Sequence, residues 1–205
     1  MANGQKATNY GIDFGCTIAN TDVTRSLWIE ENLGIEVKPW NTGFTTGYEN
    51  CVRVIGFEAY ARMSSEIYSP EWMARTPEIK GATLGIRKLS QLSNLYLLAE
   101  KGNGDVDVIR SWLKQHKLSR YFKQIVEVSG LVTAEQEMTR RSACKQFSLD
   151  AVVDDDESHL KGLVNGPSKR ILFKNWVFWE NFRVPEGVHL ARNWKEVCER
   201  LDYAE

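Results

Sequence analysis

The chain is organised around one short stretch, Tyr10-Gly11-Ile12-Asp13-Phe14-Gly15-Cys16-Thr17. Its apolar first half predicts a strand over residues 10–14, and the small residues after Asp13 predict a tight loop before a helix. Ligands bind at the carboxyl ends of strands in open α/β sheets, and backbone N–H groups of such a loop can hold an anion. The stretch therefore indicates a phosphate-handling or metal-handling site with Asp13 at its centre.

Length and composition narrow the class of protein. The 205 residues are enough for one domain, or for a core with a small inserted module. The 26 Lys and Arg against 27 Asp and Glu leave a formal net charge of −1, which predicts no nucleic-acid polymer and no membrane surface as a partner. The first nine residues lack the apolar region of a signal peptide, and the four cysteines form no CxxC pair. We therefore expect reduced thiols in a cytoplasmic protein, with no sequence signal for its oligomeric state.

Short apolar segments alternate with helical patterns along most of the chain. Further strands are expected at 95–99, 125–128, 151–153, 171–173 and 188–190. Helices are expected at 83–92 and 105–117, from a capping box at Thr133 to Phe147, and from a cap at Asn193 to Leu201. This alternation predicts an α/β fold, a Rossmann-like parallel sheet flanked by helices.

Residues 20–78 interrupt the alternation. A helix is expected from a cap at Asp22 to Glu31, with Leu27 on its buried side, and a second helix over 50–63. Many aromatic side chains lie in this block, and we expect them mostly to form the core of a small helical cap insertion over the end of the first strand. The remaining segments, 1–19 and 79–205, would then form the α/β core.

A second acidic site follows a later strand. Ala151-Val152-Val153 leads directly into Asp154-Asp155-Asp156, which makes a solvated turn the less favoured interpretation of these acids. Neighbouring parallel strands would bring Asp13 and this run to one edge of the sheet. Carboxylates that converge repel one another unless a cation lies between them, and dense oxygen ligands suit Mg²⁺.

These motifs resemble those of the haloacid dehalogenase (HAD) superfamily, whose members are mostly Mg²⁺-dependent phosphatases. The likeness covers most of the chain, and the layout is similar to that of nucleotidase-like members. Asp13 matches the family nucleophile, which becomes an aspartyl-phosphate, and Thr17 also matches the first motif. The resemblance implies an HAD-like core and a Mg²⁺ held by Asp13, the backbone carbonyl of Gly15 and an acid of the fourth motif. Asp155 is the better match for that acid, and Asp154 is the second.

The chain also departs from the family pattern. Gly15 stands where the phosphatases have an Asp that protonates the leaving group, which is worth about 10²–10⁴-fold in rate. Ala99 stands where a Thr or Ser binds the phosphoryl group. Arg140 stands where a Lys is expected, a milder change because Arg also neutralises phosphate. By position, the residues expected to contact the substrate are Cys16, Thr17, Ala99 and Arg140.

The sequence therefore predicts an HAD-like, phosphatase-type hydrolase with Asp13 as nucleophile, with activity weakened by Gly15. Its substrate would be a small phosphorylated molecule, such as a nucleotide. A catalytically inactive relative that binds a phosphorylated ligand or a protein partner is the main alternative. A dehalogenase is less favoured, and so is an actin-like or sugar-kinase ATPase, which needs a second phosphate loop and two duplicated domains. One smaller hypothesis is that Glu100 supplies the missing proton. Another is that Cys16 is a reactive thiol whose pKa is lowered by loop N–H groups; the alternative for Cys16 is a small residue that only fills the loop.

Overall fold

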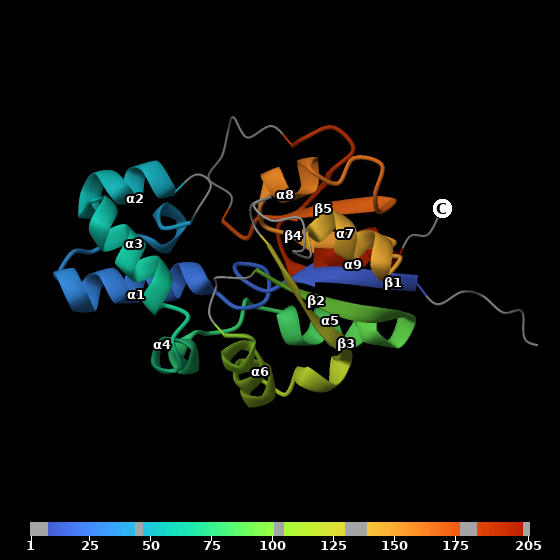
Figure 1. The fold of residues 1–205 in the computed structure, drawn as a ribbon, viewed down its shortest axis with the longest axis horizontal. Helices are drawn as coiled ribbons and strands as arrows, with labels where there is room; N and C mark the ends of the chain where they lie inside the picture. The colour runs from blue at the N-terminus through green and yellow to red at the C-terminus, as the bar shows by residue number, and fades with distance from the viewer. Residues whose placement is uncertain (1–7, 44–46, 101–104, 130–138, 177–183, 203–205) are drawn as a thin grey trace, which may run out of the picture.

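The computed structural model describes residues 8–43, 47–100, 105–129, 139–176 and 184–202, and within them one sheet contains six strands (Figure 1). The strands are β1 (Thr8–Asp13), β2 (Ser93–Glu100), β3 (Phe122–Val128), β4 (Ala151–Asp154), β5 (Lys169–Phe173) and β6 (His189–Ala191). They pair in the order β3-β2-β1-β4-β5-β6, and every pairing is parallel. The predicted α/β, Rossmann-like fold is confirmed.

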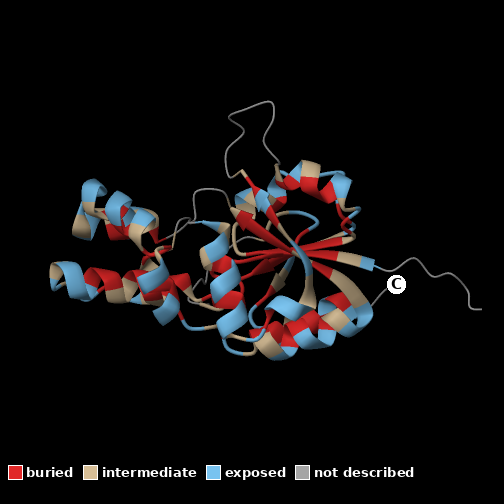
Figure 2. Cartoon of the chain, turned by 60° about the horizontal axis from the view of Figure 1, so that its bottom comes forward, coloured by how far each residue is buried: buried red, intermediate tan, exposed pale blue. Residues whose placement is uncertain are grey.

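Helices cover both faces of the sheet, and side chains alternate between those faces along each strand. Leu97 belongs to the hydrophobic cluster that includes buried residues of three helices, α5 (Ala82–Leu92), α6 (Val106–Gln115) and α9 (Trp194–Asp202). Its neighbour Leu98 belongs to a second cluster, with α7 (Arg140–Gln146) and α8 (Glu157–Lys161). The strands are accordingly buried between two helical layers, as Figure 2 shows.

The segment between β1 and α5 forms a group of helices toward which the carboxyl ends of the strands point (Figure 1). These helices are α1 (Thr21–Leu33), the 3₁₀ turn η1 (Pro39–Asn41), α2 (Tyr48–Ile55), α3 (Phe57–Glu66) and α4 (Pro70–Arg75). Their buried Trp28 and Met63 share one hydrophobic cluster with Phe14 at the end of β1. Trp112 of α6 packs edge-on against Phe14 and donates a hydrogen bond of 2.9 Å to the carbonyl of Thr76 after α4. The apolar core thus continues from the sheet into this group, and the boundary at residues 19/20 and 78/79 stays a prediction.

Helix α1 differs from its prediction in both its start and its buried face. It begins at Thr21 and is capped by Asn20, whose side chain accepts from the backbone N–H of Val23, whereas the carboxylate of Asp22 in the first turn accepts from Arg25. The buried face carries Thr21, Asp22, Thr24 and Arg25 beside Trp28 and Ile29, whereas Leu27 is only partly buried. Hydrophobic periodicity cannot find a buried face that is largely polar.

Three other segments compare the helices predicted from local sequence signals with the helices in the structure. The helix expected over 50–63 is broken at Gly56, whose φ of 82° lies in the region that favours glycine, and α2 and α3 result. The capping box at Thr133 lies outside the described residues, and α7 begins after a capping box of Thr139 and Ser142. The predicted cap at Asn193 is confirmed, because its side chain accepts from the backbone N–H of Glu196 at 3.0 Å.

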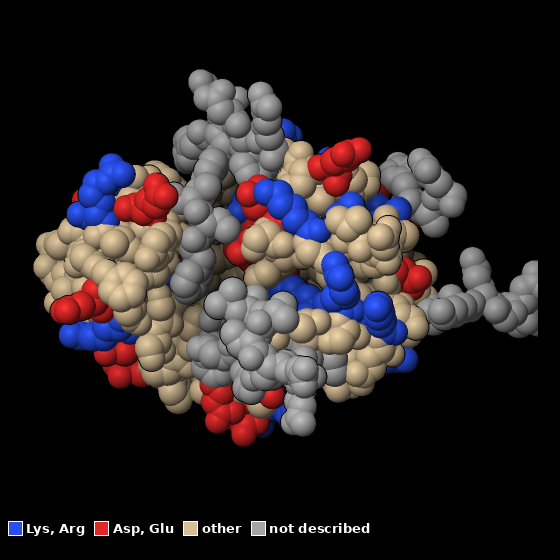
Figure 3. Space-filling model, turned by 45° about the horizontal axis from the view of Figure 1, so that its top comes forward, with Lys and Arg blue, Asp and Glu red and all other residues tan. Residues whose placement is uncertain are grey.

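No helix among the described residues has both the length and the apolar character needed to cross a lipid bilayer. Acidic and basic side chains are interspersed over the face of the molecule seen in Figure 3.

Candidate active site

Three carboxylates meet at the carboxyl edge of the sheet. β1 ends at Asp13 and β4 ends at Asp154, and the two strands are direct neighbours with Ile12 opposite Val153. One oxygen atom from each of Asp13, Asp154 and Asp155 lies within 4.8 Å of the others. The structure thus brings together the acidic residues that the sequence placed at this edge.

Arg140 joins two of these carboxylates. It is the first residue of α7, and its side chain is 6% exposed. Its Nη2 donates to Asp13 Oδ1 at 2.7 Å, and its Nε lies 3.2 Å from Asp154 Oδ2. The neighbouring Arg141 turns away and donates to the carbonyl of Gly162, and Lys145 is exposed in the last turn of α7. Arg140 is therefore the basic residue of α7 that reaches Asp13.

Asp154 is the most tightly held acid of the three. It is fully buried and accepts from the backbone N–H of Asp156 at 2.9 Å, while His159 Nδ1 lies 3.2 Å from its Oδ1. Burial alone would raise the pKa of Asp154, but Arg140 and the hydrogen bond from His159 together lower it below its usual value. Arg140 and His159 therefore favour the ionised form of Asp154, which lies between them.

The pKa values of the other two acids, Asp13 and Asp155, are raised rather than lowered. Burial raises the pKa of Asp13 well above its usual value, the charge of Asp154 raises it further, and Arg140 opposes the rise. Burial likewise raises the pKa of Asp155 to about 7; Lys174, which follows β5, lowers it, and Asp154 adds to the rise. Three buried or half-buried carboxylates with oxygen ligands facing one another are the donor set that a hard divalent cation prefers, so these residues fit a bound Mg²⁺.

The loop after Asp13 satisfies several of its own donors. The N–H of Cys16 binds the carbonyl of Ala19 at 2.8 Å, and the N–H groups of Ile18 and Ala19 both bind the carbonyl of Phe14 at 3.0 Å. These three donors close the turn and are not directed at a ligand. An anion at this loop would therefore depend on the other N–H groups and on Arg140.

Cys16 is a buried part of this loop. It adopts a φ of 51°, and its Sγ lies 3.0 Å from Thr21 Oγ1 and 3.5 Å from Arg25 Nη1. Burial raises the pKa of the Cys16 thiol well above its usual value, and the charge of Asp22 raises it further. The hypothesis of a thiol with a lowered pKa is therefore wrong, because desolvation outweighs the donors around the sulfur.

Thr17 and Ala99 were expected to contact the substrate, and both lie close to the site but are buried. The Thr17 side chain is 0% exposed, its hydroxyl has no hydrogen-bond partner among the described residues, and its carbonyl accepts from Trp194 Nε1 at 3.0 Å. Ala99 is 2% exposed and belongs to the cluster formed with α5, α6 and α9. Glu100, the next residue, is close enough for its charge to raise the pKa of Asp13.

One residue at the site was missed by the sequence analysis. Tyr68, in the turn between α3 and α4, is 3% exposed. A Cβ atom placed on Gly15 would lie 3.1 Å from the Tyr68 hydroxyl oxygen. The charges of Asp13 and Asp155 act on the pKa of Tyr68, so this phenol lies in the electrostatic field of the site. The aromatic content of 20–78 was a signal for a packed core, but it did not indicate which ring would reach the loop.

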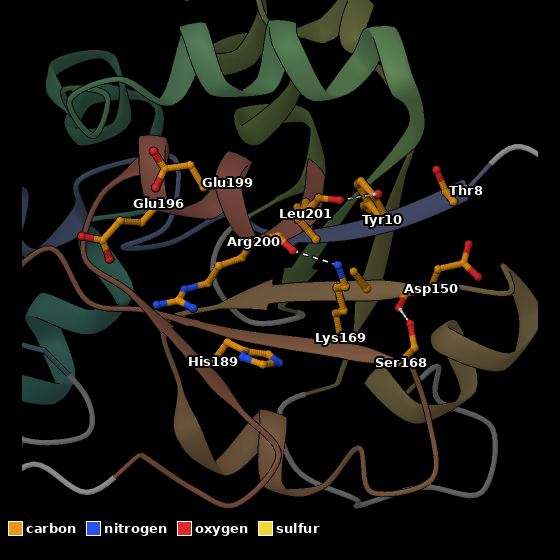
Figure 4. A pocket seen from close by; sticks show the side chains of 11 residues that line it. Thr8, Tyr10, Asp150, Ser168, Lys169, His189, Glu196, Glu199, Arg200 and Leu201 are labelled. Carbon is orange, nitrogen blue, oxygen red and sulfur yellow. Dashed lines mark hydrogen bonds between the residues drawn. The ribbon is translucent and has the colours of Figure 1, made fainter. Parts of the chain in front are cut away.

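A hollow of about 750 Å³ lies at the opposite edge of the sheet, between the amino ends of strands and the last turn of α9 (Figure 4). There Tyr10 donates to the carbonyl of Leu201 at 3.4 Å, and Lys169 donates to the carbonyl of Arg200 at 2.9 Å. These bonds satisfy carbonyls at the end of a helix. This hollow lies away from the three carboxylates, and we assign it no chemistry.

Comparison with known proteins supports the fold assignment. No family model matches the chain, and no curated protein matches it in sequence. Among solved structures, it is similar to the haloacid dehalogenase-like hydrolase SP0104 from Streptococcus pneumoniae, with a TM-score of 0.62, 13% identity and 95% and 98% of the two chains covered. It is also similar to the HAD-hydrolase YfnB from Bacillus subtilis, bound to magnesium, with a TM-score of 0.60, 14% identity and coverage of 97% and 100%. A predicted phosphoglycolate phosphatase from Haemophilus somnus 129pt gives a TM-score of 0.62, 12% identity and coverage of 97% and 100%.

These similarities extend over nearly the whole of each chain, at low sequence identity. The chain therefore has the fold of the haloacid dehalogenase superfamily, and this confirms the resemblance at the level of the fold. The activity is argued from the residues of the site.

Proposed function

We propose that this protein is a Mg²⁺-dependent phosphatase in which Asp13 is the nucleophile. The observation that carries the proposal is the convergence of Asp13, Asp154 and Asp155 within 4.8 Å at the carboxyl edge of the sheet, with Arg140 bonded to Asp13. The substrate class is a small phosphorylated molecule, such as a nucleotide, and the location is cytoplasmic.

The chemistry of the site follows from its charges. Attack on phosphorus requires Asp13 as a carboxylate, yet burial and Asp154 favour its protonated form. Mg²⁺ held by Asp13, the Gly15 carbonyl and Asp155, with Asp154 beside them, would favour the ionised form and stabilise negative charge on a phosphoryl group. Arg140 would neutralise part of the phosphoryl charge as well as orient Asp13. Magnesium in the similar YfnB structure agrees with this assignment.

Activity should be lower than in a phosphatase with a complete motif. Gly15 has no proton to give to the leaving group, and Ala99 has no hydroxyl to hold the phosphoryl group. The alternative of an inactive binding protein uses the same charged residues, but it gives no reason for the retained carboxylate of Asp13 at the centre of the cluster.

Hydrolysis of 4-nitrophenyl phosphate and of a panel of nucleotides with Mg²⁺ tests the proposal, since 4-nitrophenolate needs little help from an acid to leave. We expect slow turnover by the wild type and a loss to background in Asp13→Asn. Asp156→Asn is the matched control: it makes the same chemical change in the neighbouring acid run, and Asn caps a helix as well as Asp does. Equal rates in wild type and Asp13→Asn, or no turnover by the wild type on any substrate, would contradict the proposal.

A further inference from the structure

Another hollow is bordered by α5, by α9 and by the segments that follow β5 and β6. Its volume is about 790 Å³, which lies within the range of about 300–1,000 Å³ that small-molecule sites occupy. Leu84, Lys88, Trp176, Arg192 and Trp194 are among the residues that line it. We call it the α5/α9 hollow, and its size fits a small organic molecule.

Aromatic and aliphatic side chains form much of its wall. The rings of Phe173 and Trp194 lie with their centroids 6.1 Å apart, Trp176 also lines the hollow, and the side chain of Leu84 is 73% exposed. The indole of Trp194 lies directly against α5 because residue 85 is a glycine: a Cβ on Gly85 would lie 2.5 Å from Trp194 Cε3. The hollow thus presents apolar surface that a ligand would remove from water.

Basic side chains surround this apolar wall. Four basic residues and one acidic residue line the hollow, namely Lys80, Lys88, Arg192, Lys195 and Glu199. Lys88 is paired with Asp202, and Lys195 lies 3.6 Å from Glu199. Within the part of the chain that the structure describes, the side chains of Lys80 and Arg192 form no ion pair or hydrogen bond. Two cations without a bonded acid therefore lie beside the apolar wall.

The hollow adjoins the loop that follows Asp13 but is separate from the charged cluster. Trp194 Nε1 donates to the carbonyl of Thr17 at 3.0 Å, and Asn20, whose side chain caps α1, also lines the hollow. Its described lining residues include neither Arg140 nor the three carboxylates. An occupant would therefore contact residues that hold this loop and leave the charged cluster free.

We propose that the α5/α9 hollow binds a small aromatic anion. The wall would bury the rings of such a molecule, and Lys80 and Arg192 would pair with its acidic group. Ligand sites are typically apolar pockets in which a few charged groups fix the orientation of the ligand, and this hollow has both features. The inference concerns a place other than the three carboxylates and does not depend on the proposed phosphatase activity.

Fluorescence titration with 8-anilino-1-naphthalenesulfonate tests the charged part of the inference, because this dye joins aromatic rings to a sulfonate. Lys80→Gln/Arg192→Gln should weaken its binding by about tenfold. N-phenyl-1-naphthylamine, the same ring system without the sulfonate, should bind wild type and variant within about twofold of each other. Arg87→Gln/Lys123→Gln is the matched control, since it removes two exposed cations that do not line the hollow.

A pair of leucine variants tests the apolar wall. Leu84 and Leu92 are both exposed on α5, but Leu92 does not line the hollow. Leu84→Glu removes apolar surface and adds a carboxylate that repels the sulfonate, so it should weaken dye binding by at least about tenfold, whereas Leu92→Glu should change it by less than about twofold. Thermal unfolding shows whether each variant keeps its fold, and the replaced side chains are all exposed.

Weaker dye binding in both hollow variants, with both controls unchanged, supports the inference. No binding by the wild type, or an effect in neither or only one of the two hollow variants, would overturn it. Light scattering after size-exclusion chromatography gives a further check. If the wild type self-associates and Leu84→Glu does not, the hollow is an interface between copies of this chain, and the inference is overturned.

Discussion

Arg140 and Arg25 are both buried arginines bonded to carboxylates, but their surroundings differ in charge. Arg140 lies 2.7 Å from Asp13 and 3.2 Å from Asp154, with Asp155 in the same cluster. Arg25 lies 2.8 Å from Asp22, which is the nearest buried acid on its own helix. Three acids therefore gather around Arg140, whereas Arg25 and Asp22 form a matched pair.

The difference separates a site from a structural contact. A matched buried pair needs no further ion, and removing one partner leaves a charge without compensation. In the Arg140 cluster, burial first and the neighbouring carboxylates second raise the pKa values of Asp13 and Asp155, and a divalent cation would lower them. We infer that the Arg140 cluster is built to bind a cation and that the Arg25 pair is built to hold α1 in place.

The largest expected effect is a loss of stability when the buried pair of Arg25 and Asp22 is broken. Arg25→Met leaves Asp22 buried without its bonded cation and should lower the free energy of unfolding by about 3–5 kcal/mol, measured by urea denaturation. The double variant Asp22→Leu/Arg25→Met removes both charges and should recover most of that loss. A loss below about 1 kcal/mol in the single variant would contradict the account of this pair.

The Arg140 cluster should respond to Mg²⁺ when its own cation is removed. Arg140→Met removes the cation that competes with Mg²⁺ for Asp13 and Asp154, so Mg²⁺ should bind roughly tenfold more tightly and add about 1.4 kcal/mol to the Mg²⁺-induced stabilisation at saturation. Urea denaturation with and without Mg²⁺ measures this difference. Arg25→Met is the control, and Mg²⁺ should stabilise it no more than it stabilises the wild type. An equal Mg²⁺ effect in wild type and Arg140→Met would contradict the charge argument.

The raised pKa of Asp155 predicts how stability depends on pH without Mg²⁺. The folded state holds this proton up to about pH 7, whereas the unfolded chain releases it near its usual pKa of 3.8. The folded state therefore binds more protons between these values, and stability falls as pH rises through this window, by at most about 1.4 kcal/mol per pH unit.

Denaturation of wild type and Asp155→Asn between pH 5 and about 8 isolates this contribution. The variant should show a smaller fall than the wild type, because the raised pKa of Asp13 still contributes, and saturating Mg²⁺ should reduce the fall in the wild type because the ion binds the ionised carboxylates. If the free energy of unfolding changes with pH in the same way in both proteins, the predicted contribution of Asp155 is contradicted.

The smallest effect is expected at Cys16. The thiol is buried with a raised pKa, so Cys16→Ser should change the hydrolysis rate by less than about twofold, and iodoacetamide should modify the native thiol only slowly. Rapid modification with loss of activity would restore the reactive-thiol hypothesis.

Much of the fold and part of the site could be predicted from the sequence because the relevant signals are local. Apolar strands and cap residues such as Asn193 place the elements, and a parallel sheet brings the ends of β1 and β4 to one edge. The polar buried face of α1 and the Tyr68 contact depend on tertiary packing, which no period in the sequence encodes. The high pKa of Cys16 was missed for the same reason, since its desolvation is produced by distant residues of the fold.

The central claim is that Asp13, Asp154 and Asp155 form a divalent-cation site. Isothermal titration of Mg²⁺ into wild type, Asp155→Asn and the control Asp156→Asn tests it most directly. The account predicts one Mg²⁺ per chain in the wild type and in the control, with an affinity at least about tenfold lower in Asp155→Asn. Equal binding by Asp155→Asn and wild type, or no binding by the wild type, would contradict it.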